Sequence, residues 1–278
     1  MSGRRLRVSV AGSRGIAHPL SYREFLYSTR MASAQTARAG RPKRDKVNVV
    51  RTRLWFHMLK LRSGLPSAYA IEVTLEPSLV TRRVGGVIRP RKYDSYKNGK
   101  RVPSRIAGHG YSVDIAEASY PGTAAYFDSP IWPALRRETL EPHWIELQLS
   151  RMSPRLTAVL FKSVSASAQE RPRLKHFDAC SVDQLVDQCS FEALAALVLL
   201  TCLSEAIAST ELRSVCLGGC RCICMQLKSS EIAMFVGDLL TLVEIAFPEW
   251  VFVTPLERAE MLLLSCDVHV NHASKRKT

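Results

Sequence analysis

Cysteines crowd one short stretch of the sequence, and their spacing raises the question of a metal site. Half of the eight cysteines form the pattern Cys-x3-Cys-x-Cys-x-Cys, namely Cys216, Cys220, Cys222 and Cys224. Thiolates bind zinc well, and His269 and His272 could complete a ligand set. Structural zinc sites, however, favour closely spaced pairs that a loop separates, whereas three of these cysteines alternate. Alternate residues of an extended strand would share one face and form a thiolate cluster. We favour buried or incidental thiols of a reduced protein, and we expect no cofactor.

Other catalytic chemistry has little support in the sequence. There is no Gly-x-Ser-x-Gly, no Gly-rich loop ending in Lys-Ser/Thr and no His-Glu-x-x-His. Asp114 and Glu117 lie one helical step apart, but acids at this spacing usually form a solvated helix face. The isolated pairs Gly85-Gly86 and Gly218-Gly219 are expected in turns. We therefore predict a binding protein rather than an enzyme.

Charge gives the clearest functional signal. The chain of 278 residues carries a formal net charge of +14. Residues 1–105 contain 24 Lys+Arg and five acids, whereas residues 106–278 contain 15 Lys+Arg and 20 acids. A basic face attracts phosphate backbones and gains affinity by releasing counterions. The asymmetry favours nucleic-acid binding by the front of the chain. The alternatives are an acidic protein partner, an acidic membrane surface or a solvated basic surface.

Residues 1–48 are expected to form a disordered basic arm, because they are polar and basic without helical or strand periodicity. Met31 is an alternative translation start. Gly40-Arg41-Pro42 resembles the AT-hook, a short extended element that lays an arginine into a narrow A·T minor groove. We expect the arm to contact DNA phosphates, and its candidate residues are Arg41, Lys43 and Arg44. Residues 1–46 show no signal-peptide core, so we expect a cytoplasmic protein, associated with the bacterial nucleoid if it binds DNA.

Helical periodicity begins at Val49. Val50, Leu54, Met58 and Leu61 fall on one helix face, and Gly64 is a good helix stop. A second helix is expected over Ser67–Leu75, and residues 80–88 are expected to be a connector or a short broken helix. Pro90 and Gly99 then bracket a third, short helix, in which Tyr93 and Tyr96 share a face that we expect to pack in the core. Cations surround this face, and the candidate DNA-binding residues among them are Arg89, Arg91, Lys92, Lys97, Lys100 and Arg101.

The order of these elements resembles a known family. Three features in this order resemble the helix-turn-helix domains of the lambda-repressor/Cro superfamily. They are a basic helix, a second helix that opens with Gly64-Leu65-Pro66-Ser67-Ala68, and a short helix that ends with Tyr96-Lys97-Asn98-Gly99-Lys100-Arg101-Val102-Pro103. The resemblance covers about residues 49–135. It departs from the family at Lys97, where Glu is usual, and in the long connector before the short helix. It implies that the short helix faces DNA while Ser67–Leu75 crosses the backbone. The segment is also similar to uncharacterised proteins of bacterial mobile elements.

The second half of the chain is expected to be a helical bundle. Apolar residues recur at helical spacing from Glu141, and polar residues 163–173 form the best internal boundary. Long helices are expected over Phe191–Ser209 and Ser230–Phe247, and both carry acids that argue against membrane spans. Thr254-Pro255-Leu256-Glu257 is a helix start with a capping residue. We expect these helices to form a homodimer or to recruit a partner, and we expect no membrane association.

The sequence as a whole predicts a mainly α protein with three regions: the arm (1–48), a helix-turn-helix-like nucleic-acid-binding domain (49–140) and a C-terminal helical module (141–278). The predicted function is DNA binding in the regulation or maintenance of a bacterial mobile element. Two alternatives remain: an interaction protein whose basic front docks on RNA or an acidic protein, and a Cys-rich metal-binding protein.

Overall fold

The computed structural model describes residues 44–83, 86–104, 111–162 and 174–274. Most of these residues are helical, which confirms the predicted mainly α class. The predicted arm lies outside the described residues except for its last few positions. The described part forms one compact unit that begins at Arg44.

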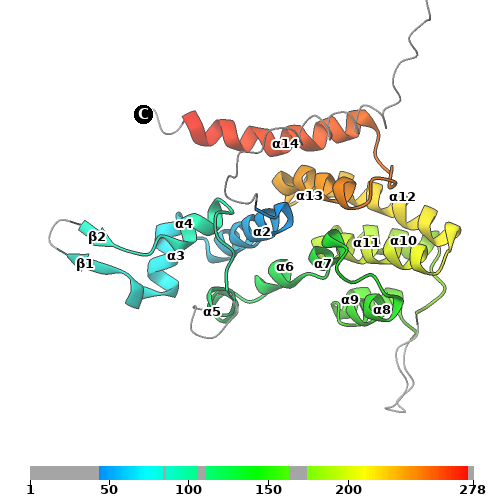
Figure 1. Cartoon of the computed structure of the whole chain (residues 1–278), viewed down its shortest axis with the longest axis horizontal. Coiled ribbons are helices and arrows are strands. Elements are labelled where there is room, and N and C mark those ends of the chain that lie inside the picture. The colour runs from blue at the N-terminus through cyan, green and yellow to red at the C-terminus, as the bar shows by residue number, and fades with distance from the viewer. Residues whose placement is uncertain (1–43, 84–85, 105–110, 163–173, 275–278) are drawn as a thin grey trace, which may run out of the picture. The chain divides into compact units, whose positions relative to one another are not determined.

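Figure 1 labels most of the elements of the described residues. In chain order they are α2 (Lys46–Ser63), α3 (Ala68–Leu75), the 3-10 turn η1 (Pro77–Leu79), β1 (Thr81–Arg83), β2 (Gly86–Ile88), α4 (Lys92–Lys97), α5 (Ser112–Ser119), α6 (Ala124–Asp128), α7 (Ile131–Arg136), α8 (Pro142–Ser150), α9 (Pro154–Leu160), α10 (Ala179–Val186), α11 (Phe191–Ala206), α12 (Thr210–Leu227), α13 (Ala233–Ala246) and α14 (Pro255–Ser274).

Helix α2 supplies side chains to two hydrophobic cores. The Asp45 carboxylate caps its start by accepting a hydrogen bond from the Val47 N–H (2.9 Å), and Gly64 ends it in the left-handed conformation. The predicted face of α2 joins a large core that α7 to α14 complete, while its opposite face, which includes Trp55, joins a small core. Leu61, expected on the buried face, is 47% exposed. Since α7 belongs to the large core, the two cores do not divide at residue 140.

The small core confirms the expected packing of the two tyrosines. It joins one face of α2 to α3, α4, α5 and α6. Tyr93 and Tyr96 are buried, and the Tyr96 ring meets the rings of both Trp55 and Tyr93 edge-to-face, with centroids 5.6 and 5.4 Å apart. Such pairs stabilise beyond the area that they bury. The aromatic face of the short helix is therefore part of the core, while Lys97 near its end is exposed.

The large core is built around α11. This helix is apolar on all sides, and α7, α8, α10 and α12 pack against it. The expectation that Gly218-Gly219 forms a turn is wrong, because both residues lie inside α12. A Cβ at Gly219 would stand 2.6 Å from Val182 Cγ1 and 3.0 Å from Leu197 Cδ2. The glycine thus permits the close approach of three helices.

Helix α14 runs alongside α13 (Figure 1). Its predicted cap is confirmed: Thr254 Oγ1 accepts from the Glu257 N–H (3.3 Å), and the Glu257 carboxylate accepts from the Thr254 N–H (2.8 Å). Leu256 and Leu263 remain 72% and 62% exposed.

The connector between α3 and α4 differs from the expected loop or broken helix. Residues 81–83 and 86–88 form an antiparallel hairpin, in which Arg82 pairs with Val87 and Thr81 with Ile88. No other described element packs extensively against this hairpin, and Figure 1 shows it extending beyond α3 and α4. The β-branched residues Thr81, Val87 and Ile88 favour strand conformation, and this signal could have predicted the two strands.

Candidate nucleic-acid interface

Two special backbone positions hold α4 in place. Arg91 adopts a left-handed conformation (φ 54°) before the helix, so the helix begins at Lys92 rather than directly after Pro90. Gly99 follows the helix with φ 61°, and a Cβ there would stand 2.7 Å from Val49 Cγ1. Only glycine suits both the dihedral angle and the close contact with α2. The end of α4 is therefore fixed against the central helix.

A buried ionic cluster joins α4 to α3. The fully buried Glu72 carboxylate accepts hydrogen bonds from Arg89 Nη1 (2.5 Å) and from the Lys92 N–H (3.0 Å). Glu76 forms an ion pair with Lys92 Nζ and accepts a hydrogen bond from the Tyr93 hydroxyl (2.9 Å). Burial, and then the negative Glu76 beside it, raises the pKa of the Tyr93 hydroxyl, so this group remains a proton donor at every physiological pH.

This cluster corrects the expected orientation of two cations. The sequence predicts that Lys92 points outward toward DNA, but this residue is only 8% exposed and forms an ion pair with Glu76. Arg89 is also engaged internally, since its second nitrogen, Nη2, pairs with Asp94 at 2.6 Å. Breaking buried pairs of this kind is strongly destabilising, because one charge is left without compensation. Lys92 and Arg89 are therefore positioning residues of the fold rather than free cations.

Four predicted residues between positions 91 and 101 remain open to solvent. They are Arg91, Lys97, Lys100 and Arg101, all exposed, and their side chains form no ion pair with another described residue. Arg44, before α2, is also exposed. Arg41 and Lys43 lie outside the described residues, as does the AT-hook-like motif.

Several cations in the C-terminal half of the molecule form ion pairs instead. In the last three helices, Arg221 binds Glu257 (2.7 Å), Lys228 binds Glu260 (2.7 Å) and Arg258 binds Glu244 (2.7 Å). Their charges are locally compensated and create little field at a distance. The exposed cations between residues 91 and 101 differ from these three in having no carboxylate partner among the described residues.

The cysteines do not form the alternating strand cluster that the sequence left open. All four lie on α12, where Cys216, Cys220 and Cys224 recur every fourth residue and face the core, while Cys222 is exposed. Burial raises the pKa of the Cys216 and Cys224 thiols to about 12, so they are protonated and poor metal ligands. Nowhere in the described ranges do three metal-ligating side chains gather. The side chains of His269 and His272 are outside the description.

Glu117 has a structural task instead of forming a solvated face with Asp114. Its carboxylate accepts hydrogen bonds from the N–H groups of Gly122 and Ala124, both at 2.7 Å, and from Thr123 Oγ1 (3.2 Å). Burial acts to raise the pKa of this carboxyl, but the N–H donors outweigh it and hold the pKa below its ordinary value. Glu117 therefore fixes the turn between α5 and α6.

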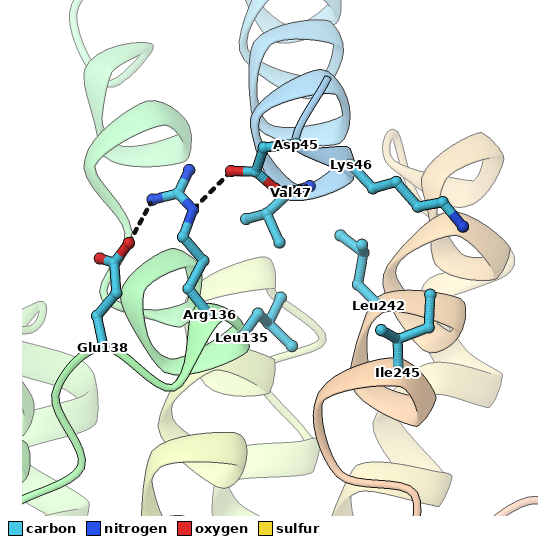
Figure 2. Close-up of a pocket in the computed structure, with 8 residues that line it drawn as sticks. All are labelled: Asp45, Lys46, Val47, Leu135, Arg136, Glu138, Leu242 and Ile245. Carbon is cyan, nitrogen blue, oxygen red and sulfur yellow. Dashed lines mark hydrogen bonds and ion pairs between the residues drawn. The ribbon is translucent and has the colours of Figure 1, made fainter. Parts of the chain in front are cut away.

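Two cavities in the described structure offer no catalytic arrangement. The first, of about 470 Å³, lies between the start of α2, the end of α7 and α13 (Figure 2). Its Arg136 guanidinium is bound by Asp45 (2.8 Å) and Glu138 (3.6 Å), and much of the remaining lining is aliphatic. The second, of about 500 Å³, has a mixed lining in which Glu192 is engaged by the Ser153 N–H (2.8 Å). Neither cavity brings together the nucleophile, base and orienting group that nucleophilic catalysis requires.

Comparison with known proteins gives no neighbour: no family model, no curated protein and no solved structure matches this chain. Within the described residues, no helix is long and apolar enough to cross a membrane.

Proposed function

We propose that the protein binds duplex DNA through the segment that runs from η1 to the start of α5. Residues 77–111 contain nine Lys+Arg and a single acid, Asp94, and two of these cations, Arg89 and Lys92, are engaged by carboxylates within the fold. The observation that carries the proposal is the set of exposed, uncompensated cations at Arg91, Lys97, Lys100 and Arg101. A phosphate backbone is the partner that gains most from such cations, because neutralising it releases condensed counterions.

Within this proposal, the helix-turn-helix resemblance supports a regulatory or maintenance role on a bacterial mobile element, in the cytoplasm at the nucleoid. A single short helix makes few base contacts, so specific binding needs a dimer. The exposed Leu256 and Leu263 on α14 support dimerisation through the C-terminal helices. Light scattering of the purified chain tests this part separately, and a monomer at micromolar concentration argues against it.

The direct test is a mobility-shift assay with the full chain at low salt. Lys97→Gln, Lys100→Gln and Arg101→Gln together are expected to weaken binding to duplex DNA strongly. A charge-matched control replaces three exposed cations outside the segment, Arg151→Gln, Arg155→Gln and Lys162→Gln. The control is expected to bind almost as the unmodified protein does. Equal losses from both triple variants would reduce the proposal to a general effect of net charge.

The rival function, docking of the basic front on RNA or on an acidic protein, has a distinct signature. The deep, narrow major groove of A-form RNA does not admit a helix or a hairpin. Structured RNA should therefore compete poorly with duplex DNA of equal length. If RNA displaces the DNA more effectively than unlabelled DNA does, RNA becomes the favoured partner.

A further inference from the structure

The second cavity lies where the small core meets the large one. It has a volume of about 500 Å³ and is bounded by the end of α2, by α6, by the end of α8 and by the starts of α7 and α11. Helix α6 contributes to the small core, whereas α7, α8 and α11 contribute to the large core. Cavities of this size at the junction of two packed units are common sites for small ligands.

Part of the cavity wall is aromatic and apolar. The rings of Tyr126 and Phe191 stack on each other, with their centroids 5.6 Å apart and their planes 19° apart. Phe191 and Met152 are buried, whereas Tyr126 is half-buried. Aromatic rings and a thioether are surfaces against which the ring of an aromatic ligand packs well.

Two arginines supply the positive charge of the cavity. Arg62 at the end of α2 and Arg151 after α8 are both exposed lining residues, and neither forms an ion pair with a carboxylate of the described residues. The Arg62 guanidinium lies beside the Tyr126 hydroxyl, at the aromatic part of the wall. The Gln148 amide also lines the cavity and can donate a hydrogen bond.

The carboxylates near the cavity are engaged within the fold. Glu192 accepts a hydrogen bond from the backbone N–H that precedes α9 (2.8 Å), and it lies in the first turn of α11, where the helix dipole favours a negative charge. Asp128 pairs with Arg51 (3.9 Å). Glu231, which does not line the cavity, accepts a hydrogen bond from the Tyr126 hydroxyl (3.1 Å). The charges that remain for a ligand are therefore those of the two arginines.

We infer that this cavity binds a small aromatic anion, with the acid group of the ligand at Arg62 and Arg151 and its ring against Phe191 and Met152. A guanidinium group binds a carboxylate or a phosphate through two parallel N–H···O hydrogen bonds. The aromatic wall and the two cations thus select for a ligand that carries both a ring and a negative charge. This site is separate from the segment that we propose for DNA, and the inference does not depend on DNA binding.

The test titrates the full-length protein with two fluorescent probes. One is 8-anilinonaphthalene-1-sulfonate, an aromatic anion, and the other is N-phenyl-1-naphthylamine, which has the same rings without the sulfonate. The protein is expected to bind one equivalent of the anion. Arg62→Gln with Arg151→Gln should weaken binding of the anion about tenfold, as expected for two exposed ion pairs, and should leave binding of the uncharged probe unchanged.

A matched control replaces two exposed cations outside the cavity, Arg155→Gln with Lys162→Gln. It should bind both probes as the unmodified protein does, and thermal unfolding should show that both variants are folded. Equal losses from the two variants, a loss of both probes, or no saturable binding of the anion by the unmodified protein would overturn the inference.

Displacement of the bound anion identifies the acid group of the ligand. Benzoate and phenyl phosphate at millimolar concentration should each displace the sulfonate probe, and the stronger competitor distinguishes a carboxylate from a phosphate ligand. If neither compound displaces the probe, the cavity does not select aromatic anions and the inference is wrong.

Discussion

Replacing Lys92 should unfold the protein far more readily than replacing its exposed neighbour Arg91. Lys92 is buried and forms an ion pair with Glu76, so Lys92→Met leaves a buried carboxylate with the Tyr93 hydroxyl as its main remaining partner. Removing one member of a buried pair costs about 3–5 kcal/mol. Arg91→Ala alters an exposed side chain and should change the free energy of unfolding by less than about 0.5 kcal/mol.

Urea unfolding followed by circular dichroism measures both changes. The double variant Lys92→Met with Glu76→Gln removes the orphaned charge, and the amide oxygen can still accept from Tyr93. Its loss of stability should therefore be smaller than that of Lys92→Met alone, by at least about 1 kcal/mol. If Lys92→Met is no more costly than Arg91→Ala, or if the Glu76 replacement adds to the damage, the assignment of Lys92 as a positioning residue is refuted.

Three further predictions concern the C-terminal half. Gly219→Ala should destabilise the protein, because the added Cβ has no room. Gly218→Ala should stabilise α12 by about 1 kcal/mol, because a Cβ there meets nothing within 4 Å. Equal effects of the two variants on thermal unfolding would contradict the close helix packing. Cys222 should react with a thiol reagent in the folded protein, while Cys216 stays protected because burial raises the pKa of its thiol to about 12. Peptide mass spectrometry distinguishes the two labelled cysteines, and equal labelling would refute the assigned burial. Hydrogen bonds, chiefly from the Arg221 guanidinium, lower the pKa of Glu257 from its ordinary 4.5 to about 2. The contribution of Glu257 to stability is therefore present above pH 4.5 and is lost as the pH falls toward 2. Glu257→Gln should flatten the dependence of Tm on pH in that window, and an unchanged slope would argue against the interaction.

The sequence predicted the features that depend on neighbours along the chain. The buried face of α2, the glycine that ends it and the capping box of α14 all follow from local spacing and from local hydrogen bonds. The core position of Tyr93 and Tyr96 also followed, because two aromatic residues on one face of a short helix need cover.

Features that depend on distant partners could not be predicted in the same way. Nothing near Lys92 in the sequence indicates that Glu76 will neutralise it, and a count of charges treats it like the exposed Lys97. Gly219 illustrates the same limit, since its role comes from the approach of α10 and α11. The hairpin differs, because the β-branched residues of its strands were a local signal that the helical pattern on both sides obscured.

The affinity of the full-length protein for duplex DNA, measured over a range of salt concentrations, tests the central claim most directly. We predict a steeply negative slope of log affinity against log salt. The slope should become less steep by up to about 2.7 when Lys97, Lys100 and Arg101 are all replaced by glutamine, because each phosphate contact contributes about 0.9. An unchanged slope in that variant, or no complex at low salt with the unmodified protein, would contradict the proposal that these exposed cations bind the DNA backbone.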